Sequence, residues 1–153
     1  MNETLPATNT VKTIRELLLK SKDQIALALP RHLNADRLLR VAMTTIQRTP
    51  KLLDCTPKSL LGAVMECAQL GLEPDGILGH AYLIPFKVKG IYQAQLMIGY
   101  KGLISLARRS GQVVSISAQV VYEKDKFEYQ YGLEEKLNHI PATGDRGKPI
   151  YVY

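Results

Sequence analysis

Cysteine is scarce in this sequence: only Cys55 and Cys67 occur among its 153 residues. Two cysteines are too few for a disulfide framework or a zinc ribbon, so we interpret both as reduced thiols of an intracellular protein. Residues 1–30 carry charges throughout and lack an apolar core followed by a cleavage site, which predicts no signal peptide. No apolar run approaches the length of a membrane span. We therefore expect a soluble, cytoplasmic protein without a membrane partner.

Motifs for catalysis and nucleotide binding are also missing. His32, His80 and His139 are far apart, and none stands in an HxxxH, HxE or CxxC setting. Residues 144–148 (GDRGK) are too short for a Walker A loop, and Pro149 stands where Ser or Thr would hold magnesium. We predict no catalytic residue, no bound metal, no cofactor and no use of ATP. A metal-dependent nuclease remains the least favoured alternative, because active sites assemble in space.

Acidic residues are absent between Gly76 and Tyr122, where five basic residues occur: Lys87, Lys89, Lys101, Arg108 and Arg109. The whole chain has a formal net charge of +6. A positive surface favours a polyanionic partner, either nucleic acid or an anionic membrane face. Nucleic acid is the interpretation that the arrangement of these residues supports better.

Apolar periodicity and turn residues predict an α+β fold. Its order is N-terminal helices, a β-hairpin, a basic helix and further antiparallel strands. After a flexible N-terminus at residues 1–12, we expect one domain over residues 13–153. The predicted helices cover residues 13–29, a segment from the Asn34 cap to Thr49, and one from the Thr56 cap to Gly71. Cys67 lies on the apolar face of the last of these, where a buried thiol is the expected role.

The predicted strands follow from alternation and flanking turns. Residues 81–86 and 93–98 should form the hairpin, with Gly90 at its bend and Pro85 at an edge or near a strand end. Residues 113–122 should form a third strand. Residues 127–131 alternate too and could pair with it through a turn at residues 123–126. The chain after Gly132 reads as polar loop until a last strand-like fragment at residues 150–153.

The helix predicted between Tyr100 and Ser110 separates into two stripes. At about 100° per residue, Arg108 returns to the direction of Lys101, with Ser105 and Arg109 beside it, while Leu103, Ile104, Leu106 and Ala107 point the other way. Together with Lys87 and Lys89 on the hairpin, this basic stripe suits the phosphates of a single strand. Tyr82, Phe86, Tyr92 and Tyr100 interleave with these cations as candidate stacking faces. For Tyr82 and Phe86, ordinary core or interface packing is the favoured interpretation.

Several segments in this region occur together in one order: residues 69–74 (QLGLEP), 79–86 (GHAYLIPF), 95–104 (QLMIGYKGLI) and 106–111 (LARRSG), flanked by 28–33 (ALPRHL) and 132–137 (GLEEKL). In these motifs the sequence closely resembles the RecT family of phage-type single-strand annealing proteins, roughly from Ile14 to Tyr153. The resemblance implies a protein that coats single-stranded DNA and anneals it to a complementary strand in homologous recombination and repair, without ATP and without enzymatic chemistry. It also implies assembly into a ring or helical filament and a 5′ to 3′ exonuclease partner.

In that family the hairpin and the following helix form part of a positive groove for DNA. The resemblance therefore assigns phosphate contacts to Lys101, Arg108 and Arg109, which lie within matched motifs, and less firmly to Lys87 and Lys89 at the hairpin tip. RecT-family chains continue well past the position that matches Tyr153. We accordingly expect an incomplete RecT-like annealing core, truncated at its C-terminal end. A single-stranded nucleic-acid-binding module without annealing activity remains the main alternative.

Overall fold

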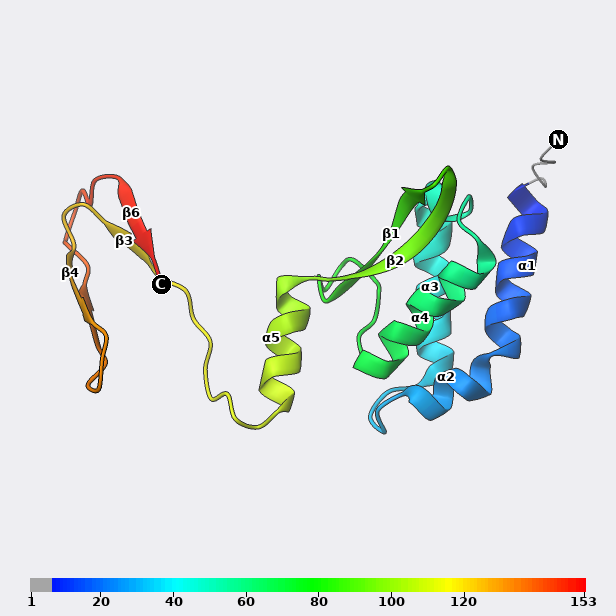
Figure 1. The fold of residues 1–153 in the computed structure, drawn as a ribbon, viewed down its shortest axis with the longest axis horizontal. Helices are drawn as coiled ribbons and strands as arrows, with labels where there is room; N and C mark the ends of the chain where they lie inside the picture. The colour runs from blue at the N-terminus through cyan, green and yellow to red at the C-terminus, as the bar shows by residue number, and fades with distance from the viewer. Residues whose placement is uncertain (1–6) are drawn as a thin grey trace. The chain divides into compact units, whose positions relative to one another are not determined.

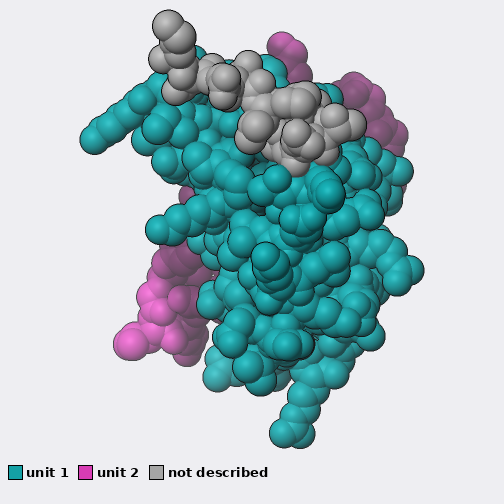
Figure 2. All heavy atoms as spheres, turned by 90° about the vertical axis from the view of Figure 1, so that its right-hand side faces the viewer, with its two compact units in different colours: residues 1–113 teal, residues 114–153 magenta. Residues whose placement is uncertain are grey.

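Helices and strands segregate along the chain into two units, residues 1–113 (unit 1) and residues 114–153 (unit 2), which Figure 2 colours separately. The structure is a computed structural model that describes residues 7–153. Within these residues, unit 1 contains five α-helices and one β-hairpin, and unit 2 contains four short strands (Figure 1). All the strand pairs are antiparallel, so the predicted α+β class is confirmed. That residues 13–153 act as one annealing domain remains a proposal.

The second and third predicted helices begin and end where their capping residues stand. Asn34 caps α3 (Ala35–Arg48), and its side-chain oxygen accepts the N–H of Asp36 at 2.8 Å. Thr56 caps α4 (Pro57–Leu70) with Pro57 in its first turn. Gly71 ends α4 in the left-handed conformation, with φ of 61°, which glycine adopts without steric cost. A short 3₁₀ turn, η1 (Pro50–Leu52), connects the two helices.

The first predicted helix is instead two helices, α1 (Ala7–Lys20) and α2 (Lys22–Ala28). Ser21, with φ of −92° and ψ of 4°, bends the chain between them, although its N–H still donates to the carbonyl of Leu17. The buried side chains on the two sides of the bend are Ile14, Leu18 and Ile25. They follow one another at helical spacing, as in a single continuous helix. α1 begins six residues before its predicted start at Thr13. The predicted flexible terminus falls partly on residues 1–6, which lie outside the described residues.

The core of unit 1 lies between the helices and one face of the hairpin. Its largest buried side chains include Leu38, Ile46, Leu60 and Val64 from α3 and α4. Cys67 has no exposed surface and belongs to this core. Burial raises the pKa of its thiol to about 12, because a thiolate is disfavoured away from water. The expectation that Cys67 is an apolar core residue is therefore confirmed.

The hairpin consists of β1 (Ala81–Val88) and β2 (Ile91–Ile98), which pair from Ala81 opposite Ile98 to Val88 opposite Ile91. Lys89 and Gly90 form the connection, with φ of 47° and 85°. Two residues of positive φ suit the right-handed twist of a tight hairpin. The predicted hairpin with Gly90 at its bend is confirmed.

The two outer edges of the hairpin differ. The start of α4 covers the edge of β2, since Ala94 N–H donates to Ser59 Oγ at 2.9 Å and Thr56 N–H donates to the carbonyl of Tyr92 at 3.1 Å. Because Ala94 directs its backbone toward α4, its partner Pro85 directs its nitrogen toward the free edge of β1. No ladder hydrogen bond is lost there, and the predicted edge position of Pro85 is confirmed.

Unit 2 pairs its strands differently from the prediction. β3 (Val120–Tyr122) pairs with β6 (Pro149–Val152), and β4 (Lys126–Gln130) pairs with β5 (Lys136–Ile140). The predicted third strand is thus confined to its last residues, its predicted pairing with residues 127–131 is wrong, and β5 occupies a segment predicted as loop. The strand-like end of the chain is confirmed as β6.

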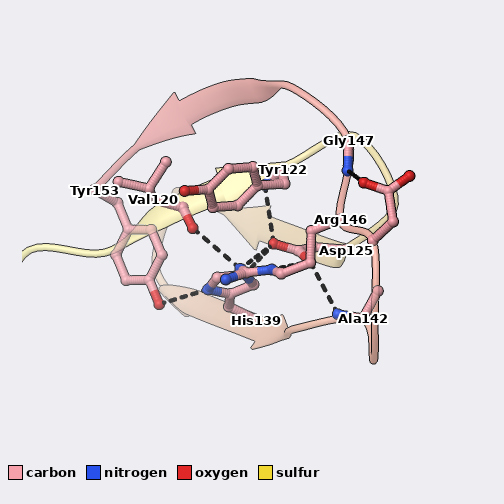
Figure 3. Close-up of polar contacts among 9 residues, drawn as sticks. Val120, Tyr122, Asp125, His139, Ala142, Arg146, Gly147 and Tyr153 are labelled. Carbon is pink, nitrogen blue, oxygen red and sulfur yellow. Dashed lines mark hydrogen bonds and ion pairs between the residues drawn. The ribbon is translucent and has the colours of Figure 1, made fainter.

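A buried carboxylate explains this arrangement. Asp125, in the turn after β3, has no exposed side-chain surface. It accepts hydrogen bonds from Tyr122 N–H, Ala142 N–H, Arg146 Nε and His139 Nε2, each between 2.9 and 3.0 Å (Figure 3). The guanidinium of Arg146 also lies over the Tyr122 ring, 4.3 Å from its centre. These bonds draw the segment after β5 against the turn after β3, so that β6 rather than β4 reaches β3.

Asp125 makes the stability of unit 2 sensitive to acid. Its hydrogen bond with Arg146, supported by those from Ala142, His139 and Tyr122, holds the pKa of the carboxyl well below its usual range. A carboxyl whose pKa is depressed by folding stabilises the folded state above the unfolded pKa of about 3.9, and that contribution is lost as the pH falls further. We expect the amides of Tyr122 and Ala142 to lose hydrogen-exchange protection as the pH falls below about 4. In Asp125→Asn, protection should already be low at pH 7 and should change less with pH.

The control for this prediction is Asp145→Asn. Asp145 pairs with Lys124 on the surface, where its side chain is largely exposed, and exposed pairs contribute little. Equal protection of Tyr122 and Ala142 in wild type and Asp125→Asn at pH 7 would contradict the role assigned to Asp125.

Candidate nucleic-acid interface

The basic helix α5 (Tyr100–Arg109) is held at its N-terminal end by glycine. Gly99 N–H donates to the carbonyl of His80 at 2.9 Å. Gly102 is the buried residue of this helix, and a Cβ added there would lie 2.1 Å from the His80 carbonyl oxygen. A Cβ added to Gly99 would lie 2.2 Å from the carbonyl oxygen of Gly79. The loop before β1 thus approaches the backbone of α5 closely at Gly99 and Gly102.

At its other end, α5 is held by Arg109. Its guanidinium donates to the carbonyl oxygens of Leu70 at 2.6 Å and Gly71 at 2.8 Å. These carbonyls end α4, where helix carbonyls lack partners within the helix and a cation is favoured. Arg109 therefore fixes the far end of α5 to the last turn of α4.

Arg109→Ala should lower the free energy of unfolding of unit 1 by about 1–2 kcal/mol, because two charge-assisted hydrogen bonds are lost at an exposed position. Arg109→Lys should recover only part of this loss, since an ammonium lacks the fork that reaches two carbonyls. Far-UV circular dichroism in a urea titration measures the effect, as all described helices belong to unit 1.

Arg108→Ala is the matched control for this measurement. Arg108 precedes Arg109 on the same helix turn and both are exposed, but only Arg109 bonds to the end of α4. Replacing Arg108 should change the free energy of unfolding by less than about 0.5 kcal/mol. Equal destabilisation by the two substitutions would contradict the anchoring role of Arg109.

Between these anchors, one side of α5 borders a hollow of about 600 Å³. Among the described residues, no carboxylate lines it; the lining residues are His80, Lys101, Ile104, Ser105, Arg108 and Arg109. The structure thus brings four of the predicted site residues to one surface, with Lys101 and Arg108 exposed. His80 was not predicted. The sequence showed only that His80 stands between Gly79 and β1. That it lines the hollow depends on α5, which begins twenty residues later in the chain.

Lys87 and Lys89 lie elsewhere. Both are at the hairpin tip, whereas the hollow adjoins the opposite end, where Ala81 pairs with Ile98. Strands rise about 3.3 Å per residue, so roughly 20 Å of hairpin separates the two groups. The Lys87 ammonium lies 5.5 Å from the centre of the Tyr92 ring. The hairpin lysines therefore form a separate positive area, and they do not line the hollow.

The aromatic residues of unit 1 are less buried than expected. Tyr82 and Phe86 alternate with the buried Ala81 and Leu83, so they lie on the hairpin face that points away from the core, and both are partly exposed. They lie outside the core of unit 1, and packing of the two rings at an interface stays a prediction. Tyr100, at the first position of α5, is also exposed.

Two further properties of residues 7–153 bear on the site. No group of three or more His, Cys, Asp or Glu side chains in this range is placed to hold a metal ion. Within the same range, no helix is both long enough and apolar enough to cross a membrane.

Comparison with known proteins identifies relatives over most of the chain. The family model described as RecT family matches residues 36–153. Protein RecT of Escherichia coli strain K12 is 49% identical over 136 residues, which cover 86% of this chain and 51% of that protein. Uncharacterized protein YqaK of Bacillus subtilis strain 168 is 31% identical over 123 residues, or 80% of this chain and 37% of that protein. The chain thus spans about half the length, or less, of these curated relatives.

Proposed function

The chain belongs to the RecT family, and from this premise we propose that it binds single-stranded DNA and anneals complementary strands in homologous recombination without ATP. The observation that carries the proposal is the hollow on α5, which Lys101 and Arg108 line and to which no carboxylate of residues 7–153 contributes. Cations that converge on a hollow without a counter-charge of their own suit the phosphates of a nucleic acid.

The chemistry of annealing requires affinity without sequence readout. Contacts to phosphates position a strand but carry no sequence information, and they leave the base edges free. A complementary strand then selects itself by Watson–Crick pairing. No covalent bond is made or broken, so neither a general acid nor a nucleophile is required of this chain.

Each candidate residue has a distinct part in the proposal. Lys101 and Arg108 contact phosphates, and the Ser105 hydroxyl between them donates a further hydrogen bond. Arg109 holds α5 in place and borders the same hollow. Lys87 and Lys89 offer a second phosphate contact at the hairpin tip, and the exposed ring of Tyr100 offers a stacking face beside Lys101.

Self-assembly into a ring or helical filament, a 5′ to 3′ exonuclease partner and a cytoplasmic location complete the proposal. Self-assembly is supported by the outward face of the hairpin, whose apolar side chains are substantially exposed: Tyr82, Phe86, Val88, Ile91 and Met97. Contiguous exposed apolar surface of this kind is typical of interaction sites.

The proposal is tested by mixing the purified chain with two complementary dye-labelled oligonucleotides in the absence of nucleotide. We expect duplex formation faster than that of the free strands. Binding without faster pairing would favour a single-strand-binding module that does not anneal. Shortening of the oligonucleotides with magnesium present would favour a nuclease instead.

A further inference from the structure

Five aromatic rings gather in unit 2, the unit that contains neither α5 nor the hairpin; we call them the aromatic cluster. Phe127, Tyr129 and Tyr131 alternate along β4 and just beyond it, while Tyr151 and Tyr153 come from the end of the chain. The Phe127 ring centre lies 5.6 Å from that of Tyr129, 5.9 Å from that of Tyr151 and 5.5 Å from that of Tyr153. Tyr131 lies 5.6 Å beyond Tyr129. The rings therefore form one continuous series.

The four tyrosine rings of the cluster are exposed to solvent. Tyr131 is 81% exposed, and Tyr129 and Tyr151 are each 55% exposed. Together with Leu137 and Lys136, the cluster lines a hollow of about 440 Å³. That volume is in the range of ligand sites, and exposed contiguous apolar surface marks a place where something binds.

The kind of side chain indicates the kind of ligand. Four of the five rings are tyrosines, which present flat faces, and two aliphatic side chains, Leu137 and Val152, also line the hollow. Every nucleobase has a π-face, so a series of rings stacks on bases of any sequence. Lys136, at the rim, makes no ion pair with another described residue, and it is available to a phosphate beside a stacked base. Glu135 also lines the hollow, so the positive charge of Lys136 and the negative charge of Glu135 balance there.

Unit 1 has a net positive charge, whereas unit 2 has a slight excess of acidic residues. Residues 1–113 contain fifteen basic and eight acidic residues, whereas residues 114–153 contain five basic and six acidic residues. Phosphate attraction is therefore concentrated in unit 1, and exposed rings are concentrated in unit 2. Two weak sites on one chain bind one strand more tightly than either does alone, because the second contact becomes intramolecular.

We propose that the aromatic cluster of unit 2 stacks on unpaired bases of single-stranded DNA, while α5 contacts the phosphates. This inference rests on the proposed function and extends it to a second site. Stacking would hold bases without occupying their pairing edges, which suits a strand that waits for its complement.

The test compares Tyr129→Ala,Tyr131→Ala with Tyr129→Phe,Tyr131→Phe in the full chain, using an oligo-dT strand. Loss of each stacking ring weakens binding by about tenfold, so we expect the alanine pair to bind ten- to a hundredfold more weakly. The phenylalanine pair keeps both rings and should bind within about twofold of wild type. The slope of affinity against salt should not change, because stacking releases no counterions. On a strand with abasic sites, the alanine pair and wild type should bind equally.

A second variant, Tyr131→Trp, reports on the site directly, because the sequence contains no other tryptophan. Its emission should fall when oligo-dT is added and stay constant when the abasic strand is added. Emission that changes with protein concentration before DNA is added would mean that a second copy covers the cluster, and it would overturn the inference.

The outcomes separate the two proposals. If wild type binds oligo-dT and the alanine pair binds equally well, base stacking by the aromatic cluster is wrong and the proposed function stands. If wild type binds no single strand at all, both are wrong.

Discussion

Gly102→Ala should separate α5 from the hairpin and abolish DNA binding. The added Cβ would lie 2.1 Å from the His80 carbonyl oxygen and 3.0 Å from Ile98 Cγ2. The first of these neighbours is backbone, which cannot rotate away as a flexible side chain can. We expect a loss of roughly 3 kcal/mol in the free energy of unfolding of unit 1, at the upper end of what overpacking costs. A urea titration followed by far-UV circular dichroism gives that value, and fluorescence anisotropy with oligo-dT gives the affinity.

Gly62→Ala is the matched control. Gly62 is also inside a helix, α4, but a Cβ added there meets no atom within 4 Å. Alanine is favoured over glycine in a helix by about 1 kcal/mol, so this variant should be as stable as wild type or more so. If Gly102→Ala proved as stable as Gly62→Ala and bound DNA normally, the close packing of α5 on the loop before β1 would not be needed.

The double substitution Lys101→Ala,Arg108→Ala should have the largest effect on DNA affinity that leaves the fold intact. Both side chains are exposed and line the hollow, and neither forms an ion pair with another described residue. On single strands each lost phosphate contact reduces the slope of log affinity against log salt by about 0.7, so the pair should reduce it by about 1.4. Affinity should fall by a similar factor on every sequence, because phosphate contacts carry no base readout.

Arg48→Ala,Lys58→Ala removes the same charge from another part of unit 1. Arg48 ends α3 and Lys58 begins α4; both are exposed and neither lines the hollow on α5. We expect a much smaller change in affinity and slope from this pair. Equal effects of the two double variants would mean that only the net charge matters, and the assignment of Lys101 and Arg108 would have to be withdrawn.

The helix boundaries were readable from the sequence because capping is a local interaction. Asn34 and Thr56 bond to backbone groups within three residues, and Gly71 needs only its own freedom at positive φ. The hairpin was readable for the same reason, since Lys89 and Gly90 join strands that are neighbours in the chain. The bend at Ser21 was not, because the apolar spacing on which the prediction depended continues across it.

The strand pairing of unit 2 could not be predicted from local sequence patterns. Alternation identifies a strand but not its partner. β3 pairs with a strand about thirty residues later, and the carboxylate that organises the turns accepts bonds from residues 14 to 21 positions away. β5 was missed because the residue of this strand that packs inward is a polar one: the His139 ring bonds to Asp125 and lies against the rings of Phe127 and Tyr153, which come from other parts of unit 2.

The basic stripe of α5 shows which features of the site helical periodicity predicts and which depend on distant parts of the chain. Helical periodicity alone placed Lys101, Ser105 and Arg108 on one side, and these residues do line one hollow. Periodicity equally placed Arg109 there, yet its guanidinium bonds to carbonyls 38 and 39 residues earlier in the chain. The sequence also placed Lys87 and Lys89 at the hairpin tip, but it could not show that the hollow on α5 adjoins the opposite end of the hairpin.

The sequence by itself determined the α+β class, the helix caps, the hairpin and the single-sign surface between Gly76 and Tyr122, because each depends on residues close together in the chain. Only the tertiary structure decided which strands pair in unit 2, that Arg109 anchors α5 to the end of α4, and that five aromatic rings meet around one hollow. These depend on groups brought together from distant positions, and the free energy that selects them comes from packing and hydrogen bonds that no local pattern records.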